Sequence, residues 1–83
     1  MNDDNLIDMA NRIGDFFASM PDHDEALAGI ADHIKRFWEP RMRRALLNTL
    51  DVAPEALNVP MTPIVRETLS AHREMLMPAA AVA

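Results

Sequence analysis

The 83-residue chain contains no cysteine, no tyrosine and only two glycines. Without cysteine it has no disulfide bond, no thiolate ligand for a metal and no cysteine nucleophile. Two isolated glycines do not make a glycine-rich loop, so the common phosphate-binding motifs are excluded. The sequence also lacks an apolar run near the roughly 20 residues that a membrane-spanning helix requires. These absences argue against a thiolate-bound redox centre, a nucleotide-binding loop and a membrane-spanning helix.

The length limits the chain to one small domain. Below roughly 70–80 residues a single core rarely supplies more than ~3–5 kcal/mol, and proteins near this limit often rely on a partner. Acidic residues outnumber basic residues by 13 to 8, and the net charge of −5 disfavours nucleic acid as that partner. Asp3 and Asp4 stand where a secretory signal would be basic, so we expect a cytoplasmic protein. The seven methionines suit either an adaptable binding surface or the gaps of a small core.

Apolar residues recur at i, i+3 and i+4, and no segment alternates as a strand would, which predicts an all-α fold. We expect a connector over residues 51–61 and helices near residues 3–19, 22–38, 41–50 and 63–77. The first two helices, joined by a short loop, should form an antiparallel hairpin. A third helix, separated by a proline, and a C-terminal helix would complete a small bundle of three to four helices. We expect a single domain over residues 1–78 and a disordered tail over residues 79–83.

Polar residues and prolines mark the expected helix ends. Asn2, Asp3 and Asp4 can supply capping oxygens to the first helix, and Asp22 can cap the second, because their side-chain oxygens can accept from free backbone N–H groups. Thr62 should cap the last helix, with Pro63 at its first position. Pro40 should break the chain between the second and third helices. The connector before the last helix should carry one turn, near residues 55–58.

The first helix should bury one apolar stripe. Its members are Leu6, Met9, Ala10, Ile13, Phe16, Phe17 and Met20. Gly14 lies inside this helix, where it lowers helix stability by about 1 kcal/mol relative to Ala. Close approach of another helix would explain the glycine, and simple tolerance would explain it equally well.

The candidate catalytic side chains do not form a recognisable site. His23, His33 and His72 fall on three different predicted helices, without the spacing that puts two metal ligands on one helical face. Neither Ser19 nor Ser70 lies in a nucleophile-elbow motif. We therefore predict no catalytic, metal-binding or cofactor-binding residues in this chain, and expect that it is not itself an enzyme.

The basic residues are unevenly distributed. Residues 1–34 carry eight acidic groups and one basic group, whereas residues 35–44, KRFWEPRMRR, hold five of the eight basic residues. Arginine, aromatic residues and methionine are the types enriched in protein interfaces. Three interpretations are open: a solvated helix end with Phe37 and Trp38 in the core, a protein-docking surface, or a site for an anionic ligand or nucleic acid, of which a compact anion is favoured because the acidic remainder would repel a long polyanion. The docking hypothesis assigns partner binding to Lys35, Arg36, Phe37, Trp38, Arg41, Met42, Arg43 and Arg44.

This stretch lies in a longer segment that resembles the delta subunit of the soluble NAD-dependent formate dehydrogenase that contains molybdenum or tungsten. The segment runs from Met9 to Leu47 and reads MANRIGDFFASMPDHDEALAGIADHIKRFWEPRMRRALL. It combines two helical patterns, a short Pro-Asp loop and the order Phe-Trp-Glu-Pro-Arg-Met-Arg. The Thr-Pro-Ile-Val sequence at residues 62–65 also resembles the family, although the family usually has serine or a similar residue before that proline.

The resemblance implies an accessory subunit without redox centres of its own. In such an enzyme the catalytic alpha subunit holds bis-molybdopterin guanine dinucleotide and iron–sulfur clusters, and beta and gamma subunits handle FMN, further clusters and NAD. The expected role is to dock on the alpha subunit and support assembly or stability of the active holoenzyme. Two alternatives remain: a transient maturation factor that helps to insert or protect the molybdenum cofactor, and an unrelated helical protein–protein adaptor.

Overall fold

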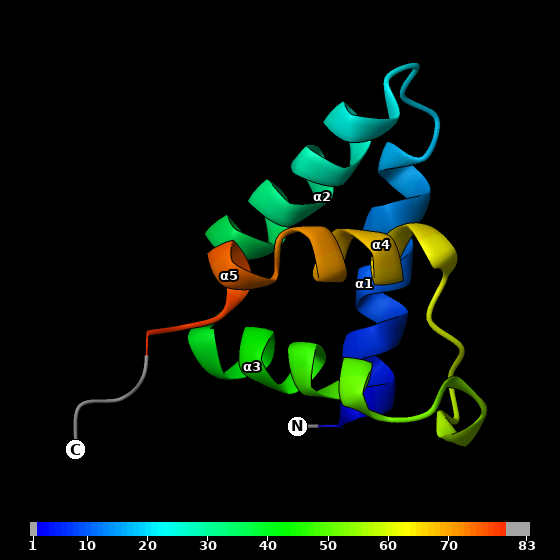
Figure 1. Ribbon diagram of the computed structural model, residues 1–83, viewed down its shortest axis with the longest axis vertical. Helices are drawn as coiled ribbons and strands as arrows, with labels where there is room; N and C mark the ends of the chain where they lie inside the picture. The colour runs from blue at the N-terminus through cyan, green and yellow to red at the C-terminus, as the bar shows by residue number, and fades with distance from the viewer. Residues whose placement is uncertain (1, 80–83) are drawn as a thin grey trace.

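The computed structural model describes residues 2–79, and all regular secondary structure in this range is helical. The elements, in chain order, are α1 (Asp3–Phe17), α2 (His23–Phe37), α3 (Pro40–Asn48), η1 (Thr49–Asp51), η2 (Pro54–Ala56), α4 (Pro63–Ala71) and α5 (Arg73–Leu76). The predicted all-α class is therefore confirmed for the described residues (Figure 1). Of the tail expected over residues 79–83, only Ala79 lies within the described range.

Among the residues predicted to cap the first two helices, the structure uses Asn2 for α1 and Asp22 for α2. The Asn2 side chain accepts a hydrogen bond from the Asp4 amide at 2.8 Å, and the Asp22 side chain accepts one from the Glu25 amide at 3.1 Å. Each cap satisfies an N–H group that has no partner within the helix. α1 ends two residues before its predicted end, and α2 ends one residue before.

The predicted break at Pro40 is confirmed, but the third helix differs from the prediction at both ends. Glu39 is extended, with φ −65° and ψ 152°, and Pro40 is the first residue of α3. The missing N–H of a proline is harmless at this position. α3 ends at Asn48 and continues as the 3₁₀ helix η1, whose tighter turn is common at the end of an α-helix. The turn predicted in the connector is η2, slightly earlier in the chain.

The prediction of a single helix over residues 63–77 is wrong, because this segment forms two helices. α4 ends at Ala71, His72 leaves helical geometry with φ −113° and ψ 25°, and the short α5 follows. This turn brings α5 into contact with α2 and α3, where Leu76 is fully buried. Thr62 occupies the predicted N-cap position, but its side chain makes no capping hydrogen bond.

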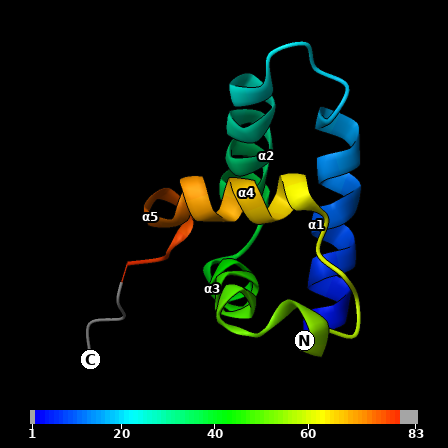
Figure 2. The same cartoon turned by 45° about the vertical axis from the view of Figure 1, so that its right-hand side comes forward.

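α4 packs across both α1 and α2, and α3 packs against α1 and α5 (Figures 1 and 2). The core between them gathers buried apolar side chains from every α-helix, including Ile7, Ile30, Leu46, Val65 and Leu76. Gly14 is buried where α4 crosses α1, and a Cβ atom at this position would lie 2.8 Å from Cγ2 of Val65. Close approach of a second helix is therefore the reason for glycine here.

The connector before α4 is fastened to α1 by Asn11. Its Nδ2 donates to the Pro60 carbonyl at 2.9 Å, and its Oδ1 accepts from the Thr62 amide at 3.0 Å. The two bonds lie on either side of Met61, which is buried in the core. One side chain thus fixes the path by which the chain enters α4.

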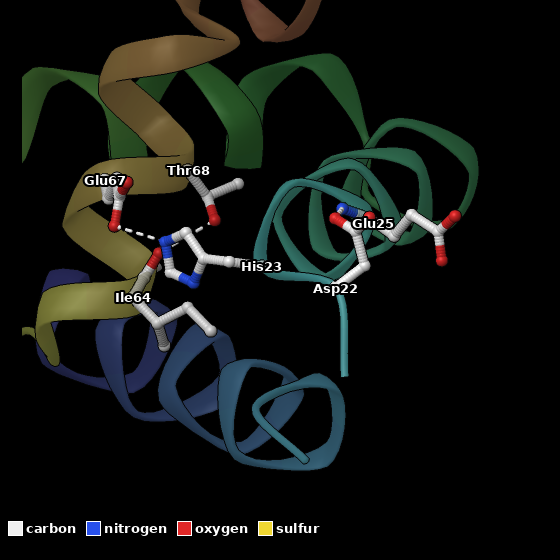
Figure 3. A network of polar contacts seen from close by, with 6 residues as sticks. All are labelled: Asp22, His23, Glu25, Ile64, Glu67 and Thr68. Atoms are coloured by element: carbon white, nitrogen blue, oxygen red, sulfur yellow. Dashed lines mark hydrogen bonds and ion pairs between the residues drawn. The ribbon is translucent and has the colours of Figure 1, made fainter. Parts of the chain in front are cut away.

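A second polar contact joins the start of α2 to α4 (Figure 3). His23 Nε2 lies 2.8 Å from Glu67 Oε1, and both side chains are more than half exposed. The next residue of α4, Thr68, is buried, and its hydroxyl donates to the Ile64 carbonyl of the same helix at 2.8 Å. The first of these contacts therefore joins α4 to α2, whereas the second lies within α4.

Candidate partner-binding surface

The two neighbouring aromatic residues of the basic stretch point to different environments. Trp38 is the C-cap of α2, with φ −95° and ψ 138°, and is only 6% exposed in the core. Phe37, the last residue of α2, is 71% exposed. The change from helical to extended backbone between them turns one ring inward and leaves the other outside. The interpretation that put both rings in the core therefore describes Trp38 but not Phe37.

Arg43 is buried despite its charge, at 7% exposure. Its Nη1 donates to the Lys35 carbonyl at 3.1 Å, whereas its Nε has no hydrogen-bond partner among the described residues. Lys35 lies in the last turn of α2, where free carbonyl groups carry partial negative charge and favour a cation. Arg43 thus fastens α3 to the end of α2.

The other residues of the predicted docking surface lie at or near the surface. Met42 is half-buried against the core. Arg36 is exposed and pairs with Asp32 one turn earlier, at 3.1 Å between Nε and Oδ2. Lys35, Arg41 and Arg44 are exposed and make no ion pair with the residues that the structure describes.

The predicted residues therefore do not form one continuous surface in the chain by itself. Two of them, Trp38 and Arg43, support the junction between α2 and α3 from within. The exposed cations lie on both sides of that junction. Partner binding by the basic stretch stays a prediction, and its accessible part consists of Lys35, Arg36, Phe37, Arg41 and Arg44, with part of Met42.

A second group of side chains, which we call the aromatic cluster, consists of Phe16, Phe17, His33 and Phe37. The Phe16 and Phe17 ring centroids are 5.2 Å apart, and the planes are nearly perpendicular at 84°. The Phe17 and His33 centroids are 6.5 Å apart, and those of His33 and Phe37 are 4.8 Å apart. The rings therefore form a continuous row from α1 to α2. A hollow of about 330 Å³ lies beside them, lined by Arg12, Ile13, Phe16, Phe17 and His33.

The sequence pattern assigned Phe16 to the buried stripe of α1, but this residue is 76% exposed. The buried face of α1 includes Ile7, Ala10 and Gly14, and α4 approaches α1 closely at the glycine. An α-helix turns by about 100° per residue, so Phe16 lies about 200° around α1 from Gly14. The buried face of α1 is therefore rotated away from Phe16, toward the side of the apolar stripe that carries Ile7 and Gly14. The positions of Ile7 and Gly14 are the sequence feature that indicates this.

The histidines remain apart in the structure. His23 contacts Glu67, His33 belongs to the aromatic cluster, and His72 lies at the turn between α4 and α5. Within residues 2–79, no three His, Cys, Asp or Glu side chains are grouped so that they could hold a metal ion. No helix in the same range is both long enough and apolar enough to cross a membrane.

Comparison with known proteins adds a family assignment. The family model described as NADH-dependent formate dehydrogenase delta subunit FdsD matches residues 5–69. The matched region includes nearly all of α1, the whole of α2 and α3, and most of α4. No curated protein sequence and no solved structure matches the chain.

Proposed function

Because the chain belongs to the NADH-dependent formate dehydrogenase delta subunit family, we propose that it is a non-catalytic accessory subunit of such a dehydrogenase. It docks on the catalytic alpha subunit within a complex that also has beta and gamma subunits, and it supports assembly or stability of the holoenzyme in the cytoplasm. The partner subunits carry the bis-molybdopterin guanine dinucleotide, the iron–sulfur clusters, FMN and the NAD site. This chain binds none of these groups.

The observation that carries the proposal is the family match over residues 5–69 of an 83-residue chain. A docking role also agrees with the surface, because Phe16 and Phe37 are large apolar side chains that are 76% and 71% exposed. Exposed aromatic side chains that gather in one place are typical of protein interaction sites.

The direct test is to co-express all subunits and purify the complex through an affinity tag on the alpha subunit. We expect this chain to co-purify at a fixed ratio, and its deletion to lower the yield of assembled holoenzyme. A complex that assembles equally well without the chain, and never contains it, would contradict the proposal.

The predicted role of the basic stretch is tested in the same preparation with Arg41→Glu combined with Arg44→Glu. Both side chains are exposed, so their charge can be reversed without disturbing the core. Arg43 is unsuitable for this purpose, because its buried side chain supports the fold. Unchanged recovery of the double variant would remove Arg41 and Arg44 from the docking surface.

One observation favours the maturation factor as a second candidate. Arg41 and Arg44 are exposed on α3 and pair with no carboxylate among the described residues. Free guanidinium groups are well suited to phosphate, including the pyrophosphate of a molybdenum cofactor. This role predicts transient association, with the double Arg41 and Arg44 variant lowering the cofactor content of the alpha subunit while the subunit composition stays the same.

A further inference from the structure

The paired helices α1 and α2 have one covered face and one open face. α4 covers the first, with Val65 against Gly14 and with Glu67 bonded to His23. The second carries Phe16 and Phe37, and no element within residues 2–79 packs over their rings, which are 76% and 71% exposed. Met9 extends this face along α1, two turns before Phe16, and is 42% exposed.

The open face is continuous from one helix to the other. Phe17 packs over Gly29 of α2, where a Cβ atom would lie 2.6 Å from the Phe17 ring. The missing side chain at Gly29 lets the ring bridge the two helices and contact His33, which in turn contacts Phe37. The hollow of about 330 Å³ lies beside these rings, and Ile13 and Phe16 line it from α1. An exposed apolar groove of this kind is the surface on which an amphipathic helix of another protein can lay its apolar face.

Helical spacing places six exposed charged residues along the outer sides of α1 and α2 beside the open face. They are Asp8, Arg12, which also lines the hollow, and Asp15 on α1, and Glu25, Asp32 and Arg36 on α2. Four carboxylates and two guanidinium groups give a net charge of −2 on this border. Both arginines are already paired with an aspartate one turn earlier, at 3.2 Å for Arg12 and 3.1 Å for Arg36. Asp15 and Glu25 make no ion pair within the described residues.

We propose that the open face of α1 and α2 binds an amphipathic helix of a dehydrogenase subunit, one with an apolar stripe bordered by lysine or arginine. This inference rests on the proposed function. Phe16 and Phe37 enter the apolar stripe of that helix, and its basic border faces Asp15 and Glu25. Charge complementarity selects this partner over a second copy of the chain, because two copies would each bring a net charge of −5 and an acidic border.

The test uses the complex purified through a tagged alpha subunit, with variants of this chain as the only change. Phe16→Ser, Phe37→Ser and their combination are compared with Met75→Ser, which alters an exposed apolar side chain on α5, away from this face. We expect each phenylalanine variant to weaken retention of the chain by about tenfold or more, as for a central interface residue. Met75→Ser should be retained as wild type. Thermal unfolding of each free chain should be unchanged, since the replaced rings are exposed.

The proposed charge complementarity is tested with two double variants that change the net charge equally. Asp15→Lys with Glu25→Lys should weaken retention several-fold, and more strongly at low salt. Glu55→Lys with Glu74→Lys makes the same change in net charge at exposed positions outside α1 and α2, and should leave retention unchanged. A photo-reactive residue in place of Phe16 should crosslink to a helix that carries lysine or arginine beside its apolar stripe.

The outcomes distinguish a failure of the proposed accessory role from a failure of the proposed docking face. If the wild-type chain is not retained, the proposed function fails and this inference fails with it. If the wild-type chain is retained and both phenylalanine variants equal Met75→Ser, the docking face is wrong while the accessory role survives. If the free chain sediments as a dimer that the phenylalanine substitutions dissociate, a second copy occupies the face and the proposal is overturned. Crosslinking to an acidic or non-helical segment would overturn it as well.

Discussion

Gly14 offers a test in which two physical effects predict opposite signs. Replacement by alanine raises intrinsic helix stability by about 1 kcal/mol, and this effect alone would stabilise the protein. The new Cβ atom, however, would lie 2.8 Å from Cγ2 of Val65 and 3.1 Å from Cγ2 of Ile64. Val65 is fully buried and β-branched, so its side chain has little freedom to move away. Overpacking of a buried contact costs about 1–3 kcal/mol.

We therefore expect Gly14→Ala to lower the free energy of unfolding by up to about 2 kcal/mol, with a value near 1 kcal/mol as the centre of the range. For a domain of this size each 1 kcal/mol corresponds to a fall in Tm of about 4–8 °C. Thermal unfolding followed by far-UV circular dichroism measures the change. An increase in Tm would show that α4 does not press on Gly14 in solution, and would refute the reasoning.

Two further variants isolate the cause. Val65→Ala removes the methyl group that the new Cβ would meet, so the double variant should be more stable than the sum of the two single changes, by about 0.5–2 kcal/mol. Gly29→Ala makes the same chemical change in α2, where the close neighbour is the ring of Phe17. That ring borders the open face and can move outward, so Gly29→Ala should cost less than Gly14→Ala. Additive energies in the first comparison would exclude a steric origin.

Three other substitutions test the contacts that position the helices. Asn11→Ala should lower the free energy of unfolding by about 1–3 kcal/mol and speed hydrogen exchange at the Thr62 amide, because that N–H group loses its acceptor; unchanged exchange would contradict the contact. Arg43→Glu, which places an uncompensated charge in the core, should cost about 3–5 kcal/mol and abolish the helical circular dichroism signal at 25 °C, whereas Arg43→Met should remain folded. His23→Ala should change the urea midpoint by the equivalent of less than about 1 kcal/mol, because its contact with Glu67 is exposed; a larger loss would mean that this contact contributes more than the geometry indicates.

The sequence was a good guide where local chemistry sets the structure. α1 and α2 begin at Asn2 and Asp22 because these side chains can cap free N–H groups, and such caps are readable from a few adjacent residues. The end of α4 is different, since residues 64–77 contain no proline or glycine and the apolar spacing continues past His72. The turn there follows from burial of Leu76 between helices that are distant in sequence, which local spacing does not encode.

For the candidate surface, the sequence indicates which residue types are present but not which of their side chains are exposed. Arginine, phenylalanine and methionine in one stretch indicate a binding surface, but burial depends on where the backbone leaves the helix. The extended conformation at Trp38 decides that Trp38 points inward and Phe37 outward. Likewise the choice between Arg43 and Arg44 depends on the carbonyl of Lys35, one helix away. The partnership of Phe37 with Phe16 requires the packing of α1 on α2, which no single segment specifies.

The two hydrogen bonds of Asn11 also bear on the order in which the chain folds. They join positions that are 49 and 51 residues apart in sequence. Closing so long a loop carries an entropic cost, so we expect these bonds to form at a late step, after the intervening helices have assembled. Interactions that form after the folding barrier act on the unfolding rate more than on the folding rate. We therefore expect the two bonds to lower the unfolding rate, because they hold the start of α4 against α1.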